Sequence, residues 1–272
     1  MNFDLLPQDC LAHILSLAST REACRLSIVS ETMHSMANSD VVWEKFLPFD
    51  CEEVLSRLDS PLVCSTKKEL YLKLCCPHLI DGGKKVFYID KKTSKKCYIL
   101  GARELQIQWS NNPLYWSWNR QPFLKSSRFE EVAELRTIWW LEIKGRINTK
   151  LLSPKTLYFA YLLVKFADRA YGLNNHPSQA SVQLNTVTSQ REVYLDKERG
   201  CNNGGLSKNR VVDRGSDDET EEDDCGWVKI ELGEFYVNDL GDGDVEMCLK
   251  EVESQHLRGG LVVEGIQLRP RM

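Results

Sequence analysis

The spacing of apolar residues divides the chain into an N-terminal part and a longer C-terminal part. In the first part, apolar positions recur every three or four residues, as they do between residues 10 and 18, which is the period of an amphipathic helix. Ser19 and Glu22 form a capping-box pattern that starts a second helix. We therefore expect a small helical bundle over residues 1–47. Because so short a bundle buries little apolar surface by itself, its size favours a partner.

Two further helices are expected before the pattern changes. The segments 51–58 and 67–76 both have helical spacing, and Pro77 stops the second of them. Residues 48–83 are therefore interpreted as a helical linker between the two parts of the chain.

From about residue 84 the apolar period shortens to two residues, which is the period of a β-strand. Strands are predicted at residues 105–109, 140–148, 181–187, 191–195, 227–235, 245–252 and 261–268. So many strands at this spacing favour an antiparallel β-sandwich over residues 84–272. The expected fold class is α+β, with a jelly-roll-like sandwich after the helical bundle. For residues 153–166 the pattern leaves one helix and two strands as open alternatives.

One segment, residues 200–226, departs from the strand pattern. Residues 217–224 hold seven acids in eight positions and no apolar side chain. A segment of this composition cannot bury enough apolar surface to pack. It predicts a mobile acidic insertion between strands, and the role of its acidic part, residues 213–224, is left open.

Composition limits the partners and the compartment. With 42% hydrophobic and 27% charged residues and a net charge of −4, the chain is typical of a globular protein without general affinity for nucleic acid. The longest apolar run, residues 157–164, is too short to cross a bilayer, so no membrane insertion is expected. The ten cysteines are irregularly spaced, and the N-terminus has no basic segment typical of a secretory signal. These features favour reduced thiols in the cytoplasm, the nucleus or both.

The usual signatures of catalysis are missing from the sequence. It contains no G-x-S-x-G, H-E-x-x-H or G-x-x-x-x-G-K-[ST] motif. Residues 75–78 (CCPH) bring two thiols and an imidazole together, but no second half of a zinc site follows. We expect no catalytic residue, no metal site and no cofactor.

The N-terminal bundle carries an ordered set of apolar residues. They are Leu6, Pro7, Ile14, Leu15, Leu26, Val29 and Trp43. Over residues 3–47 this combination resembles an F-box. The resemblance implies binding to a Skp-type adaptor and, through it, to a cullin–RING ubiquitin ligase. An apolar surface too large for so small a bundle to hide favours an interface, and the alternative is that these residues form the core of a capping subdomain.

The C-terminal part resembles the phloem protein 2 lectins, the Nictaba-like family of plants. The resemblance is carried by residues 98–109, 114–116, 127–135, 140–147, 152–164, 226–235, 245–252 and 259–270. It spans nearly all of residues 84–271, and an F-box joined to this module is an arrangement known in plants. The resemblance implies a β-sandwich that binds N-acetylglucosamine oligomers or N-glycan cores.

The segment 105–119, LQIQWSNNPLYWSWN, mixes tryptophan with amides and hydroxyls, which together suit a pyranose ring. The family resemblance ties sugar binding to Trp109 and Trp116. Strand alternation, however, places Trp109 on a buried face, whereas Trp116 follows a turn and is expected on an exposed loop, sharing a face with Trp118. Among the acids of the predicted strand 245–252, Glu251 is expected to form hydrogen bonds with sugar hydroxyls. The tryptophans expected in the core are Trp139, Trp140 and Trp227.

Together, the two resemblances predict that the chain is a non-catalytic substrate receptor of an SCF-type ubiquitin ligase. The F-box would bind the adaptor, and the lectin-like sandwich would select target proteins, glycoproteins among them. The alternative is a carbohydrate-binding stress lectin of the cytoplasm and nucleus that acts without a ligase. Fold alone does not decide between these functions.

Overall fold

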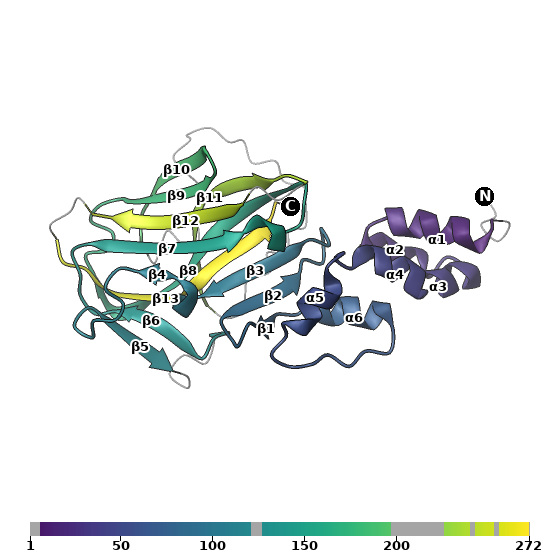
Figure 1. Ribbon diagram of the computed structural model, residues 1–272, viewed down its shortest axis with the longest axis horizontal. Coiled ribbons are helices and arrows are strands. Elements are labelled where there is room, and N and C mark those ends of the chain that lie inside the picture. Colours follow the sequence, from purple (N-terminus) through teal and green to yellow (C-terminus); the bar gives the residue numbers. More distant parts are fainter. Residues whose placement is uncertain (1–5, 121–126, 197–225, 240–242, 253–255, 272) are drawn as a thin grey trace.

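A computed structural model places the chain in one elongated body with the helices at one end (Figure 1). It describes residues 6–120, 127–196, 226–239, 243–252 and 256–271. Apart from Gly226, the predicted acidic insertion at 200–226 lies outside the described residues.

Six α-helices form the N-terminal end within the described residues. They are α1 (Gln8–Leu17), α2 (Thr20–Leu26), α3 (Glu31–Ala37), α4 (Asp40–Phe46), α5 (Cys51–Ser56) and α6 (Lys67–Leu74). The predicted capping box is present, because the Ser19 hydroxyl accepts from the Glu22 amide and the Glu22 carboxylate accepts from the Ser19 amide. The hydroxyl of Thr66 caps α6 in the same way, by accepting from the Glu69 amide. These caps confirm the helices that the sequence predicts, and α5 and α6 are each shorter than expected.

Thirteen strands follow among the described residues. They are β1 (His78–Ile80), β2 (Lys85–Ile89), β3 (Lys96–Gly101), β4 (Gln106–Ile107), β5 (Trp116–Arg120), β6 (Glu131–Leu135), β7 (Leu141–Asn148), β8 (Thr156–Tyr171), β9 (Ser178–Leu184), β10 (Val187–Val193), β11 (Val228–Val237), β12 (Asp244–Glu251) and β13 (Gly259–Pro270). One sheet has the order β1-β2-β3-β13-β6-β5, with β8 pairing both β13 and β11, and the other has the order β10-β9-β12-β7-β4. All of these pairings are antiparallel, so the predicted antiparallel sandwich is confirmed.

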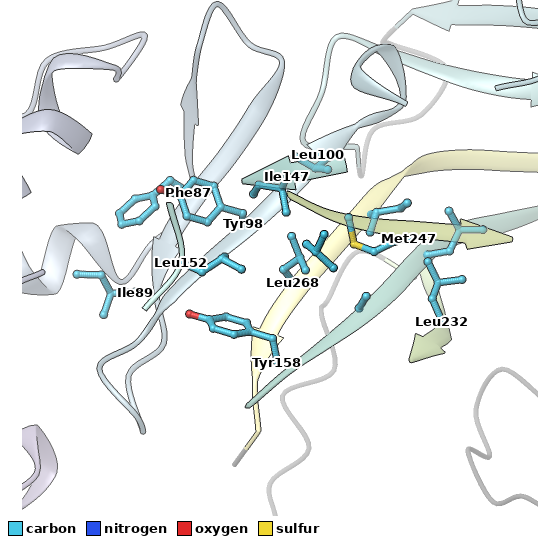
Figure 2. Close-up of a cluster of buried hydrophobic side chains, with 14 of the residues drawn as sticks. Phe87, Ile89, Tyr98, Leu100, Ile147, Leu152, Tyr158, Leu232, Met247 and Leu268 are labelled. Atoms are coloured by element: carbon cyan, nitrogen blue, oxygen red, sulfur yellow. The ribbon is translucent and has the colours of Figure 1, made fainter. Parts of the chain in front are cut away.

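The two sheets face each other across one apolar core. Figure 2 shows Tyr98 and Leu268 from the larger sheet in the same cluster as Ile147 and Met247 from the smaller one. The sheets approach closely at Gly145, where an added Cβ would lie 2.7 Å from Cδ1 of Ile266 in the opposite sheet. A side chain at this position would therefore require the Ile266 side chain to shift within the packed core.

The segment that the apolar pattern left open, residues 153–166, belongs to the single long strand β8. Its burial alternates from Thr156 to Leu162 and then becomes continuous as far as Val164. Because β8 lies between β11 and β13, its apolar run is covered by long-range pairing that no local pattern reveals.

The helices are joined to the sandwich by direct packing. Residues 57–59 pair with β1, and β1 pairs with β2, so residue 84, the expected boundary, lies inside a β-hairpin. The buried ammonium of Lys96, at the start of β3, forms an ion pair with Asp50, with 2.7 Å between Nζ and Oδ2. One apolar cluster runs from the bundle into the sandwich. The segment 48–83 is therefore a packed junction.

An ion pair in this junction gives a pH-dependent prediction. Nε and Nη2 of Arg57 donate to the two carboxylate oxygens of Asp81, each at 2.9 Å. The hydrogen bond from Arg57 lowers the pKa of Asp81 from 3.8 to about 2. A carboxyl whose pKa is depressed by folding stabilises the protein above its unfolded pKa, and it loses that contribution as the pH falls from 3.8 toward 2.

We expect Asp81→Asn to lower the free energy of unfolding by about 2 kcal/mol at pH 7. The difference from the wild type should shrink as the pH drops below 3.8. Urea denaturation at several pH values measures it, with the exposed Asp168→Asn as the control. A loss that stays constant down to pH 3 would contradict the assignment.

Candidate binding surfaces at the two ends of the molecule

Helix α1 is apolar on two faces, and only one of them is covered. Leu11 and Leu15 are fully buried in the bundle. Ile14 is 43% exposed and Leu17 is 74% exposed, and their spacing of three residues places them on a common face. The core of the bundle needs only one apolar face of α1. The second apolar face therefore indicates a binding partner.

The residues predicted to bind an adaptor separate into two groups. Leu6, Pro7, Ile14 and Val29 are exposed, and Leu26 is half-buried. Leu15 and Trp43, which were expected on the same surface, lie in the core. The Trp43 indole N–H donates to the Ala37 carbonyl at 2.7 Å, and its ring packs 5.3 Å from that of Tyr71, which explains the burial.

Three exposed apolar residues of the bundle were missed from the sequence. Leu17 and Ile28, the latter 87% exposed, belong to the same part of the bundle sequence as the predicted set, and Val41 of α4 is the third. The exposed apolar set is thus defined as Leu6, Pro7, Ile14, Leu17, Ile28 and Val29. Leu17 could have been found from its spacing to Ile14.

The smaller sheet shows which end of the sandwich lies far from the helices. Strand β7 ends at Asn148, next to the segment where the Ser153 hydroxyl accepts from the amide of Lys96 at the junction. Its other end, Leu141, pairs with Glu251, the last residue of β12. Eight residues of strand span about 26 Å, so the start of β7 is the distal end of the molecule (Figure 1).

A tightly held loop, residues 108–115, lies at this distal end and is called the aromatic loop. The indole N–H of Trp116 donates to the Gln108 carbonyl, and that of Trp118 donates to the Ser110 carbonyl, both at 3.0 Å. Trp109 has a positive φ of 57°, which turns the chain after the two-residue strand β4. The predicted strand 105–109 is therefore wrong in extent, and Trp109 leaves the buried face that alternation assigned to it.

Three aromatic rings gather on this end, and we call them the aromatic platform. The ring centroids of Trp109 and Tyr115 are 5.3 Å apart, those of Trp109 and Trp139 are 5.6 Å apart, and those of Tyr115 and Trp139 are 6.0 Å apart. Trp109 is 36% exposed and Trp139 is 45% exposed. Exposed aromatic rings of this kind suit stacking against the apolar face of a sugar.

The expectation that Trp139 and Trp140 lie in the core is wrong. Both are exposed, whereas Trp227 is buried as predicted. The two residues lie between the bridge that Ile138 makes with Arg258 and the start of β7, so they sit at the sheet end.

Trp116 is buried, which reverses the exposure expected from the sequence. It begins β5, pairs with Leu135 of β6 and is only 1% exposed. Its ring fills the core, and its N–H holds the aromatic loop. In this arrangement Trp116 has no free face for a sugar, and its contribution to a site is to position the loop that carries Trp109.

Trp118 is half-buried, and a guanidinium covers it. The centre of the Arg103 guanidinium lies 3.5 Å from the centroid of the Trp118 ring. This cation–π contact occupies one face of the indole.

Glu251 also lies elsewhere than the sequence suggested. Its side chain is buried and forms an ion pair with Arg258, which is itself 2% exposed. Strand alternation places Glu251 on the inward side with Leu249, so the sequence did carry a signal for its burial. A carboxylate held there does not face solvent as a partner for sugar hydroxyls.

In the described part of the chain, no cluster of three or more His, Cys, Asp or Glu residues could hold a metal ion. The helices among these residues are all too short or too polar to span a membrane.

Comparison with known proteins agrees with both ends of this description. The family model for phloem protein 2 matches residues 95–270, and the F-box-like model matches residues 3–48. The chain is 40% identical to F-box protein PP2-B10 of Arabidopsis thaliana, over 98% of this chain and 94% of the relative. It is 40% identical to F-box protein PP2-B15 of the same plant, over 98% and 96%, and 38% identical to the putative F-box protein PP2-B12, over 100% and 99%.

Solved structures add little. A family 16 carbohydrate binding module aligns with 52% of this chain and 77% of its own length at 13% identity, with a TM-score of 0.28, which is too low to support an argument. The full-length matches to the plant proteins are sufficient to assign the family. The chain belongs to the family of F-box proteins that carry a phloem protein 2 domain.

Proposed function

We propose that this chain is the non-catalytic substrate-recognition subunit of an SCF-type E3 ubiquitin ligase. In this function the exposed apolar set binds a Skp-type adaptor, which links the chain to a cullin–RING ligase. The aromatic platform at the distal end takes the target. The observation that carries the proposal is that two exposed surfaces, one apolar and one aromatic, lie at opposite ends of one packed body.

The adaptor half of the proposal is supported by the composition of the exposed apolar set. Large apolar side chains such as Ile14, Leu17 and Ile28 are each well exposed on a bundle that has already filled its own core. Burying a fully exposed side chain of this size contributes about 1.5–3 kcal/mol, and a partly exposed one such as Ile14 contributes correspondingly less. The set is therefore large enough to anchor a stable interface.

The target half is supported by the aromatic platform. Trp109 and Trp139 offer exposed rings. The Asn112 side-chain oxygen accepts from the Leu114 backbone amide, which helps to fix the aromatic loop that carries Trp109. Rings fixed before the ligand arrives lose little conformational freedom on binding. The proposed targets carry N-acetylglucosamine oligomers or N-glycan cores.

The proposed location is the cytoplasm, the nucleus or both. The eight cysteines within the described residues are free, and three of them, Cys75, Cys97 and Cys248, are buried. Thiols that remain unpaired are typical of a reducing compartment, where ubiquitin ligases act.

Co-purification with a Skp-type adaptor tests the adaptor half. We expect the double variant Ile14→Glu/Val29→Glu to lose the adaptor, because it puts two charges into an apolar interface. The control is Val63→Glu, an exposed apolar position between α5 and α6, outside the F-box-like segment. It should recover as much adaptor as the wild type does.

Two results would contradict this half of the proposal. Equal recovery for all three proteins would mean that the exposed apolar set is not the adaptor surface. No recovery even with the wild type, together with sugar binding, would favour a carbohydrate-binding lectin that acts without a ligase.

A further inference from the structure

A polar pocket lies beside the aromatic loop, on the side of β5. Its volume is about 450 Å³. Its polar lining residues are Arg103, Ser110, Asn111, Ser117, Asn119 and Arg136. Among these residues there are two guanidinium groups, two amides and two hydroxyls, and no carboxylate. The pocket therefore presents positive charge and hydrogen-bond donors to whatever enters it.

The Arg103 guanidinium is held in place by part of its hydrogen-bond donors, and the others can bind a ligand. Its Nε donates to Oε2 of Glu131 at 2.6 Å, and its guanidinium stacks on Trp118. Among the described residues, the hydrogen bonds of this guanidinium use only Nε, which leaves its terminal nitrogens available. Its side chain is 46% exposed, so a ligand can reach it. A planar guanidinium fixed in this way is preorganised for a two-pronged contact with a carboxylate.

Arg136 supplies the second positive charge. Its backbone amide donates to the Tyr115 carbonyl at 2.8 Å, so its position is tied to the aromatic loop. The side chain is exposed, and no carboxylate of the described residues forms an ion pair with it.

The carboxylates near the pocket are already engaged. Glu131 accepts from both Arg103 and Arg120, which lowers its pKa. Glu134 accepts from the Asn119 amide across the β5–β6 pair. Neither carboxylate is among the residues that line the pocket, although their charges partly offset those of the arginines.

The aromatic loop joins this pocket to the platform. Ser110, Asn111 and Pro113 line the pocket, while Trp109 and Tyr115 of the same loop belong to the platform. We infer that the pocket binds the carboxylate of an acidic sugar residue whose neighbour stacks on the platform, so that the ligand is an acidic oligosaccharide. This rests on the proposed sugar binding and narrows it to one chemical class.

Titration calorimetry on the full chain tests the inference with three probes: trigalacturonate, neutral chitotriose and tetraglutamate. We expect trigalacturonate to bind more tightly than chitotriose, and Arg136→Gln to weaken its binding about tenfold or more. The same variant should leave chitotriose binding unchanged. Raising the salt from roughly 0.05 M to 0.5 M should weaken only the acidic sugar. The matched control is Arg169→Gln, an exposed arginine of β8 outside the pocket lining, which should change neither affinity.

The outcomes separate this inference from the proposed function. If chitotriose binds but trigalacturonate binds no better, or Arg136→Gln has no effect, the inference of an acidic-sugar pocket is wrong, while the proposal of sugar binding stands. If neither sugar binds, both are wrong. If tetraglutamate binds as tightly as trigalacturonate, the pocket recognises a carboxylate on a peptide and the saccharide assignment is overturned.

Discussion

Replacing Asp50 with alanine is expected to reduce the free energy of unfolding by about 3–5 kcal/mol, because it leaves a buried ammonium without its carboxylate. The Lys96 side chain is 2% exposed, and its Nζ lies 2.7 Å from Oδ2 of Asp50. Burial already lowers the pKa of Lys96 even with this partner present. Without Asp50, the ring of Phe49, 5.3 Å from Nζ, is a weak substitute.

The loss should depend on pH in a defined direction. A lysine whose pKa is depressed by folding binds fewer protons in the folded state, so stability rises with pH through its titration range. The Asp50→Ala protein should therefore recover part of its stability toward about pH 10, where the lysine becomes neutral at a lower cost.

Two further variants serve as controls for this prediction. The double variant Asp50→Ala/Lys96→Met removes both charges and should recover most of the lost stability, since a buried pair can be replaced by apolar groups at little net cost. Lys96→Met alone leaves the Asp50 carboxylate, whose side chain is 12% exposed and whose Oδ1 is buried, without its cation. Urea denaturation of the four proteins measures these differences. A double variant no more stable than Asp50→Ala would contradict the explanation.

This ion pair matters for function because it joins the two ends. Asp50 precedes α5 in the helical end, and Lys96 begins β3 in the sandwich. The hydroxyl of Thr20, the first residue of α2, also donates to the Lys91 carbonyl at 3.2 Å. With such contacts, the exposed apolar set and the aromatic platform are held at a fixed separation. In the proposed ligase, that separation would set where a bound target is presented.

Most of the fold could be predicted because its signals are local. Hydroxyl caps such as Ser19 and Thr66 mark helix starts, and two-residue alternation marks strands such as β7. β8 could not be assigned, because a fully covered strand and a buried helix share the same apolar run, and only its pairing with β11 and β13 separates them.

The binding surfaces were harder to predict because they depend on chain reversal and long-range pairing. The positive φ of Trp109, which turns its ring away from the strand face, leaves no mark in the composition. Trp139 is exposed because Ile138 bridges Arg258, more than a hundred residues later. Local alternation did mark Glu251 as inward-facing, but its buried partner Arg258 could be identified only from the fold.

The second large effect is expected at Trp116, and it separates the two tryptophans that the family resemblance ties to sugar. Trp116→Ala should reduce the free energy of unfolding by about 3–5 kcal/mol, because a fully buried indole leaves a cavity. Trp109→Ala removes a partly exposed ring and should reduce it by about 1 kcal/mol. Urea denaturation distinguishes these two results.

For sugar affinity, measured on folded protein only, the change at Trp109 should have a larger effect than the change at Trp116. Trp109→Ala removes a ring of the platform and should weaken chitotriose binding by roughly 1 kcal/mol or more, about fivefold in affinity. Trp116→Phe keeps an aromatic ring in the core but loses the N–H that donates to the Gln108 carbonyl. It should lower stability by about 1 kcal/mol and weaken the sugar less than Trp109→Ala does, because it acts only through the loop. If Trp116→Phe instead abolishes binding while Trp109→Ala leaves it intact, Trp116 must reach the ligand through a conformation in which β5 opens, and the platform is misplaced.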